Sequence, residues 1–237
     1  MSKKHYFLVL DVETANSTTD ALVYDVGYAV TDRTGAIYEA DSFIVSDIFF
    51  DEADLMKSAY YASKIPQYLA GIETRAFKVR HFSAVRAIIA DAIERYSIEA
   101  VCAYNASFDY KALNTTERWL TKSKYRYFLP CGTKVFCIWH MACQTICMQK
   151  RYVRFCLENN LVSASGNIST SAETVYAYLT KDAGYSEHHT GLEDVLIETR
   201  IMAHCFRQHK KMDKTINRLC WRIPQAQAKE IKKQIGE

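Results

Sequence analysis

The sequence has few of the residues that interrupt regular structure: only 3 prolines and 8 glycines among 237 residues. Collagen-like repeats and flexible linkers are therefore excluded. It also has no apolar run near the ~18 residues that a membrane-spanning helix needs, so no membrane partner is expected. The first apolar run, which ends at Asp11, is too short to be the apolar core of a signal peptide. These absences predict a cytoplasmic globular protein.

The cysteines also lack a familiar arrangement, because no two of the eight have the Cys-x-x-Cys spacing. One segment nevertheless gathers potential zinc ligands, namely Cys131, Cys137, His140, Cys143 and Cys147. The last three also follow helical spacing within an apolar stretch, which is typical of a packed helix face. The sequence leaves these two interpretations open. Without an export signal, the thiols are expected to be reduced.

What is present is typical of a packed α/β protein. Apolar residues make up 49% of the chain and aromatic residues 13%, which excludes a disordered chain. Apolar runs predict three antiparallel strands at 6–12, 22–31 and 36–45, and short strands at 99–104 and 135–138. Helical patterns occupy most of 85–96, 105–120, 139–161, 171–179 and 191–206. This order predicts a mixed five-stranded sheet flanked by helices.

The end of the chain differs from the rest in charge. Residues 207–237 hold nine basic and three acidic residues, a net charge of +6, whereas residues 1–206 have a net charge of −3. We therefore expect a main domain over 1–206 and a basic C-terminal tail over 207–237. A polyanionic partner is one explanation of the tail. A solvated, lysine-rich helix is the alternative.

Two carboxylates, Asp11 and Glu13, lie at the end of the first predicted strand. Side chains alternate along a strand, so both are expected on one face. Neighbouring carboxylates on an apolar strand are costly unless a cation neutralises them. A solvated strand end is the simpler alternative.

Further candidate residues begin two of the predicted helices. Asp109 lies in the first turn after the fourth strand, where the helix dipole alone favours an acid. Loops beside strand ends are also where α/β proteins build their sites. Asp194 lies on a largely apolar face of the last strong helix, just after His188 and His189. Two solvated histidines at a helix start are the alternative here.

Together these motifs resemble the DEDDh family of 3′–5′ exonucleases, which belongs to the ribonuclease H-like superfamily. Residues 8–14 (LVLDVET) are similar to the first family motif. Residues 104–109 (YNASFD) are similar to the second, with Tyr104 where many members have histidine. Residues 189–194 (HTGLED) are similar to the third, and the spacing selects His189 over His188.

The resemblance, which spans roughly residues 5–206, implies a ribonuclease H-like α/β fold, to which the charge pattern adds a basic C-terminal extension. It implies a metal-dependent exonuclease that removes nucleoside 5′-monophosphates from the 3′ end of single-stranded DNA. Two divalent ions, Mg²⁺ or Mn²⁺, would be held by Asp11, Glu13, Asp109 and Asp194, since carboxylates are the ligands that these ions prefer. His189 would be the general base. Thr14 and Ala15 would contact the terminal nucleotide.

Several alternatives remain at this level. The substrate is single-stranded nucleic acid, with DNA favoured over short RNA. A non-catalytic nucleic-acid-binding module on the same fold is a second possibility, although the complete set of five site residues argues against it. A replication or repair protein is left open as a further partner.

Overall fold

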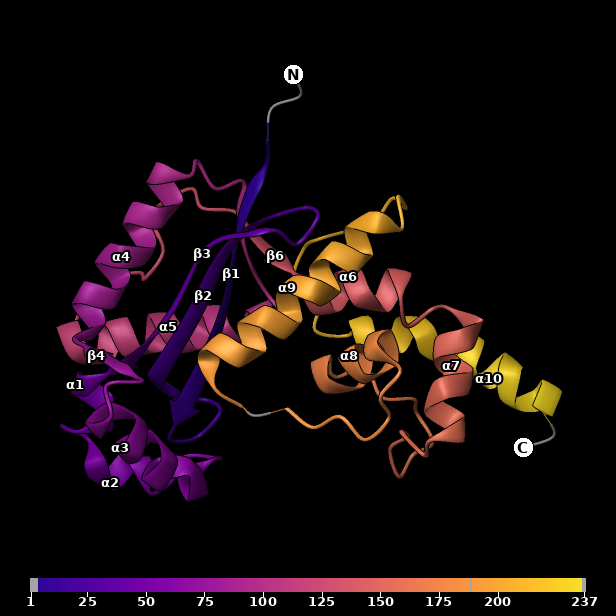
Figure 1. Ribbon diagram of the computed structural model, residues 1–237, viewed down its shortest axis with the longest axis horizontal. Helices are drawn as coiled ribbons and strands as arrows, with labels where there is room; N and C mark the ends of the chain where they lie inside the picture. The colour runs from indigo at the N-terminus through magenta and orange to yellow at the C-terminus, as the bar shows by residue number, and fades with distance from the viewer. Residues whose placement is uncertain (1–3, 188, 236–237) are drawn as a thin grey trace.

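The centre of the molecule is a mixed sheet of six strands in the order β4-β3-β2-β1-β5-β6 (Figure 1). The computed structural model describes residues 4–187 and 189–235. The strands are β1 (Tyr6–Ala15), β2 (Leu22–Asp32), β3 (Ile37–Val45), β4 (Lys78–Arg80), β5 (Ala100–Ala103) and β6 (Val135–Cys137). The first three are antiparallel neighbours, and β4, β5 and β6 are added in parallel. The predicted antiparallel meander is confirmed.

The sheet has one strand more than the five expected from the sequence. The additional strand, β4, has only three residues and pairs with Phe43–Val45 at the edge of the sheet. Its single apolar residue, Val79, lies between Lys78 and Arg80. Such a short segment has no apolar pattern to recognise, and its pairing with β3 is what makes it a strand.

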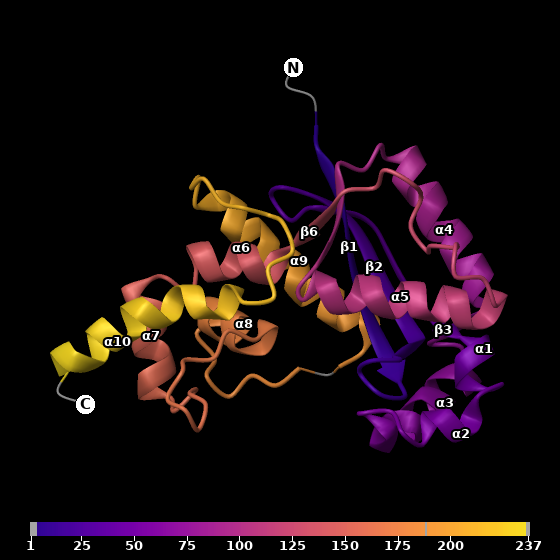
Figure 2. The same ribbon diagram turned by 180° about the vertical axis from the view of Figure 1, so that it is seen from behind.

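Helices cover both faces of the sheet (Figures 1 and 2). On one side lie α1 (Ser46–Phe49), α2 (Ala53–Met56), α3 (Ile65–Glu73), α4 (Phe82–Arg95) and α5 (Ala106–Thr121). On the other lie α6 (Ile138–Thr145), α7 (Lys150–Glu158), α8 (Ala172–Thr180), α9 (Gly191–Arg207) and α10 (Ile223–Ile235). Two 3₁₀ turns, η1 (Ala62–Lys64) and η2 (Cys220–Arg222), complete the elements. None of these helices is long and apolar enough to cross a bilayer.

Side chains of β1 point alternately to the two faces of the sheet, so this strand contributes to the apolar core on each face. Leu8 and Leu10 belong to the core under α4 and α5, whereas Phe7 and Val9 belong to the core under α9. Asp11 follows the same alternation as Phe7 and Val9, so it falls on the α9 side of the sheet.

The C-terminal segment packs on the main body. In η2 and α10, the side chains of Cys220, Ala228 and Ile231 are buried in contact with α6 and α7. Gln225 exchanges two hydrogen bonds with the backbone of Ile168, at 3.0 and 3.1 Å. The segment is therefore an amphipathic part of the fold. Lys229 and Lys233 are exposed, while Lys232 is half-buried and donates to the Gly166 carbonyl at 2.8 Å.

Close contact between β2 and the start of α9 depends on glycine. A Cβ atom on Gly27 would lie 2.0 Å from the carbonyl oxygen of Gly191. The Gly191 N–H donates to Asp25 Oδ2 at 3.1 Å, and Tyr68 donates its hydroxyl to the same oxygen at 2.8 Å. The helix N-terminus, whose N–H groups have no partners within the helix, is thereby held against the sheet.

We predict that Gly27→Ala destabilises the protein, because the added methyl group must push α9 away from β2. Overpacking of this kind typically costs about 1–3 kcal/mol. The free energy of unfolding, measured by denaturant titration, tests this. Gly184→Ala is the matched control, since its Cβ would meet only Asp182 Oδ1 at 3.6 Å. Equal stability of the two variants would contradict the close-contact explanation.

Candidate functional site

Carboxylates from β1, α5 and α9 meet at one end of the sheet. Burial raises the pKa of Asp11 well above its ordinary value, and the negative charges of Glu198, Asp109, Asp194 and Glu13 raise it further. These groups therefore act on one another as a single cluster. The structure brings together the four acids that the sequence pattern singled out, although they are spread over more than 180 positions of the chain.

The tightest part of the cluster is formed by Glu13, His189 and Asp194. One potential ligand atom from each lies within 4.8 Å of the other two, and no other such group of His, Cys, Asp or Glu residues occurs in the described chain. His189 Nδ1 lies 4.0 Å from Asp194 Oδ2 and 3.7 Å from an oxygen of Glu187. Side chains from β1 and from the start of α9 thus converge on one point.

Asp109 reaches the cluster because β5 is shorter than β1. The parallel pairing of the two strands ends at Val9 and Cys102. The β1 residues after Val9 therefore have no pairing partner on β5. The Val12 N–H instead donates to the Asp109 carboxylate in the first turn of α5. This hydrogen bond lowers the pKa of Asp109, but burial raises it more, to about 7.

Glu198 belongs to the same cluster and was missed from the sequence. It lies one helical turn after Asp194 on α9 and is almost completely buried. Its Oε2 accepts a hydrogen bond from the Tyr104 N–H at 3.1 Å. Burial, followed by the charges of Asp109 and Asp194, raises its pKa well above the ordinary value. The i, i+4 relation to Asp194 was the available signal, since such residues share a helix face.

The electrostatics of the cluster suit a cation. Burial, with a further contribution from Asp194, raises the pKa of Glu13 to about 9, and burial raises that of Asp194 to about 7. Asp194 Oδ1 is buried and has no hydrogen-bond partner among the described residues. Buried carboxylates without partners are costly, and divalent ions such as Mg²⁺ bind oxygen ligands of this type. The residues present therefore fit a divalent metal centre.

His189 is positioned by contacts that no sequence motif revealed. Its ring stacks on Tyr61, with centroids 4.3 Å apart and an angle of 18° between the planes. Its φ of 50° lies in the left-handed region. Lys64, from the same stretch of chain as Tyr61, lowers the pKa of both Glu13 and Asp194 by its charge. His188, the competing histidine of the sequence pattern, lies outside the described residues.

The segment after Glu13 contains a β-bulge. Glu13 pairs with Asp25 and Thr14 pairs with Val23, so Tyr24 is the extra residue on β2. Bulges increase the local twist of a strand and are common beside active sites. Thr14 is half-buried, whereas Ala15 is completely buried and offers no accessible side chain to a ligand. Their contact with a terminal nucleotide stays a prediction.

The cysteine-rich segment forms packed structure. Cys137, Cys143 and Cys147 are buried as free thiols, while Cys131 is exposed. His140 donates from Nδ1 to the Thr215 carbonyl at 2.8 Å. Within the described chain these residues do not form a cluster that would suit a metal. The structure therefore favours the packed helix face over a zinc site.

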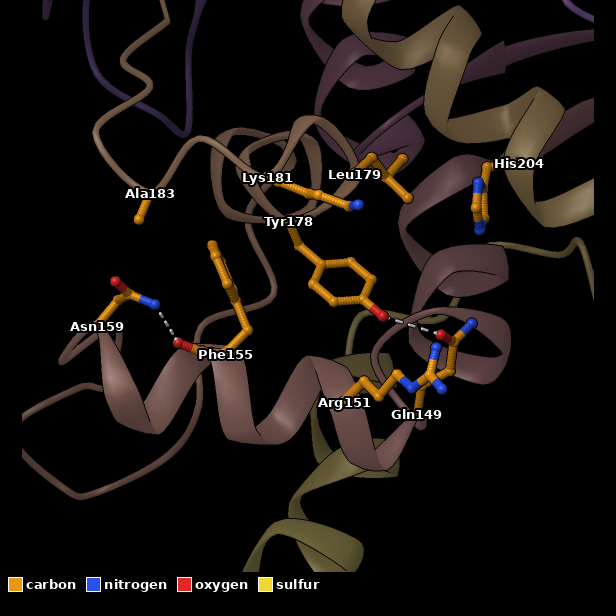
Figure 3. A pocket seen from close by; sticks show the side chains of 9 residues that line it. All are labelled: Gln149, Arg151, Phe155, Asn159, Tyr178, Leu179, Lys181, Ala183 and His204. Carbon is orange, nitrogen blue, oxygen red and sulfur yellow. Dashed lines mark hydrogen bonds between the residues drawn. The ribbon is translucent and has the colours of Figure 1, made fainter.

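A separate cavity of about 520 Å³ lies between α7 and α8, next to His204 of α9 (Figure 3). Its lining includes Arg151, Tyr178 and Lys181, and the hydroxyl of Tyr178 points toward Gln149, to which it donates a hydrogen bond at 3.1 Å. No acidic residue is among the described residues that line it. It holds none of the motif residues, so it is distinct from the carboxylate cluster.

Neither a protein-family model nor a curated protein matches the sequence. Solved structures do match. E. coli exonuclease I with a dA16 oligonucleotide is 18% identical with a TM-score of 0.52, and the match covers 84% of this chain and 40% of that one. The same enzyme with a 5cy-dT13 oligonucleotide is 17% identical with a TM-score of 0.50, over 86% and 42% of the two chains. An ExoI/SSB-Ct complex is 14% identical with a TM-score of 0.50, over 86% and 43%.

The chain thus spans about two-fifths of the length of the exonuclease I chains that it matches. The similarity extends over most of the present chain. At identities of 14–18% it concerns the fold. The molecule has the α/β fold of exonuclease I.

Proposed function

We propose that this protein is a metal-dependent 3′–5′ exonuclease that hydrolyses single-stranded DNA from its 3′ end and releases nucleoside 5′-monophosphates. The observation that carries this proposal is the cluster of Asp11, Glu13, Asp109 and Asp194 with His189 beside it. The oligonucleotide complexes of exonuclease I, which has the same fold, support DNA as the substrate. Short RNA is the alternative substrate, and a non-catalytic nucleic-acid-binding protein is the alternative function.

The four carboxylates are the residues that would hold two divalent ions, Mg²⁺ or Mn²⁺. When bound, such ions stabilise the charge that develops on the phosphoryl and leaving oxygens and lower the pKa of water. The protein itself supplies rigidity. Asp109 is fixed by the Val12 N–H, and α9 is fixed by the contact of Gly191 with Asp25. Thr14 and the backbone of Ala15 are proposed to contact the terminal nucleotide.

His189 is proposed to take the proton from the attacking water. Its Nδ1 faces oxygens of Glu187 and Asp194, at 3.7 and 4.0 Å. An N–H on Nδ1 can point at these acceptor oxygens, so we propose the tautomer that carries its hydrogen on Nδ1, which leaves Nε2 able to accept a proton. Stacking on Tyr61 keeps the ring in this orientation.

The ExoI/SSB-Ct complex is an example of a protein with this fold that binds a partner. We include a replication or repair protein among the proposed partners on this basis. The catalytic proposal does not depend on it.

We predict that Asp11→Asn abolishes release of nucleotides from a labelled single strand, because one metal ligand charge is lost. Without metal, the same variant should melt at a higher temperature than the unmodified protein, since the cost of burying an ionisable acid in the crowded cluster is removed. Asp51→Asn, at an exposed position, is the matched control and should change neither property. Full activity in the presence of a chelator would rule out the metal-dependent mechanism. Parallel digests of DNA and RNA strands decide the substrate.

The stability of the metal-free protein should depend on pH in a characteristic direction. In the folded state the pKa values of Glu13, Asp109 and Asp194 are raised to about 9, 7 and 7. Between roughly pH 4 and pH 9 the folded state therefore binds more protons than the unfolded chain, so stability falls as the pH rises. Thermal melting in a chelator should show this fall between about pH 5 and pH 8, and Mg²⁺ should reduce it. A melting temperature that rises over this range would contradict the cluster.

We predict that His189→Ala lowers kcat by ~10²–10⁴, the usual effect of losing a general base. Strand binding, measured by fluorescence anisotropy, should be retained. His209→Ala, at an exposed position after α9, is the control and should have full activity. The spacing of the motif predicts a milder effect of His188→Ala. If His188→Ala had the larger effect, His188 would be the general base and our alignment of the third motif would be wrong by one residue.

A further inference from the structure

Two adjoining cavities lie along the outer side of α5. The first, of about 290 Å³, is lined by Asn105, Ser107, Phe108, Lys111, Trp139 and Arg218. The second, of about 350 Å³, continues along the helix to Arg118 and Tyr127. They share Ser107, Lys111 and Arg218, so they form one continuous depression. We refer to it as the α5 groove.

The groove is positively charged. Lys111, Arg118 and Arg218 line it, and none of its described lining residues is acidic. Lys111 and Arg118 are seven residues apart on one face of α5, a separation of roughly 10 Å along the helix axis. The groove therefore offers an extended row of cations, in contrast to the carboxylate cluster at the start of the same helix.

Aromatic rings lie between these cations. Tyr110 and Tyr127 are 37% and 49% exposed. The guanidinium of Arg118 lies 5.0 Å from the centre of the Tyr127 ring. Phe108 and Trp139 line the end of the groove nearest the site. A basic groove with accessible rings is the arrangement that binds single-stranded nucleic acid, because the cations follow the phosphates and the bases stack on the rings.

The groove begins where the candidate site ends. In the first turn of α5, Asp109 is buried and receives the Val12 N–H, whereas its neighbours Ser107 and Phe108 line the groove. One helical turn thus contributes to both features. Lys111 is two residues after Asp109, about 200° around the helix axis, so a strand with its 3′ end among the carboxylates would pass around the first turn of α5 to reach the groove.

The C-terminal segment contributes to the groove through one residue. Arg218 donates from Nε to Ser107 Oγ at 2.8 Å, which places it over the first turn of α5. The segment is held there by a hydrogen bond from the Cys137 N–H to the Lys214 carbonyl at 2.8 Å and by the buried Cys220. Figure 2 shows this segment beside the start of α5, whereas α10 extends away from it toward α7. The remaining donors of the planar guanidinium suit a phosphate.

We propose that the α5 groove binds the sugar–phosphate backbone of the single strand on the 5′ side of the nucleotide held at the carboxylate cluster. Lys111, Arg118 and Arg218 contact phosphates, and Tyr110 and Tyr127 support bases. The basic C-terminal segment acts on the strand through Arg218, and the lysines of α10 take no part. The proposal rests on the exonuclease function proposed above and identifies its substrate-binding surface.

Binding of a fluorescent oligothymidylate to the full chain tests the proposal. Anisotropy is measured over a range of salt concentrations in the Asp11→Asn background, so that the strand remains intact. Lys111→Ala, Arg118→Ala and Arg218→Ala should each weaken binding and reduce the log–log salt slope by ~0.7, the value for one lost phosphate contact on a single strand. Lys229→Ala removes the same charge from the exposed side of α10 and should leave affinity and slope unchanged. Thermal melting verifies that each variant is folded.

Cleavage in the otherwise unmodified protein provides the second measurement. The groove variants should raise KM more for a long strand than for a dinucleotide, which is too short to occupy the groove. Unchanged slopes in all three variants, an equal loss with Lys229→Ala, or no strand binding at all would overturn the proposal. If the strand were cleaved but the salt slopes were unchanged, the proposed role of the groove would be wrong and the proposed exonuclease function would stand. Reduced slopes without any cleavage would overturn the exonuclease and leave the groove as a nucleic-acid-binding surface.

Discussion

The crowding of carboxylates at the end of β1 is the constraint on which the rest of the structure depends. Burial raises the pKa of each acid in the cluster, and the charges of neighbouring acids raise the pKa of Asp11, Glu13 and Glu198 further, so these groups oppose being held together when no cation is present. The fold offsets this with rigid contacts at each element. The Gly27–Gly191 contact fixes α9, and the bond from Val12 to Asp109 fixes α5. The proposed divalent ions would relieve this repulsion, since carboxylate oxygens are the ligands that such ions prefer.

Charge is divided along α5 in a way that suits a polyanionic substrate. Its buried first-turn acid, Asp109, belongs to the cluster, while its outer side carries Lys111 and Arg118. The proposed nucleic-acid substrate would be repelled by free carboxylates and attracted by the neighbouring cations, to which the C-terminal segment adds Arg218. The local arrangement of charge matters more than the net value of +3, which by itself says little about a partner.

Much of the fold was predictable because it follows local patterns. The meander β1–β2–β3 and the helices over 106–121 and 191–207 follow directly from apolar periodicity. Ser171 caps α8 through a hydrogen bond from the Thr174 N–H, which agrees with a helix beginning near residue 171. Strand β4 was missed because a segment of three residues is too short to show the alternating apolar pattern of a strand. The contacts of the C-terminal segment were missed because its composition suited a solvated helix equally well.

For the candidate site, the sequence by itself determined the two neighbouring carboxylates of the first strand, Asp11 and Glu13, which period two predicts on one face. The resemblance of the motifs to an exonuclease family added Asp109, Asp194 and His189 as predictions. Only the tertiary structure decided what surrounds them. Tyr61 on His189, the charge of Lys64, the buried Glu198 and the placement of Arg218 all come from segments distant along the chain or lacking a motif. The periodicity of apolar residues predicts the face of a helix or strand on which a side chain lies. Which residues of other elements that side chain contacts depends on how the helices and strands pack together.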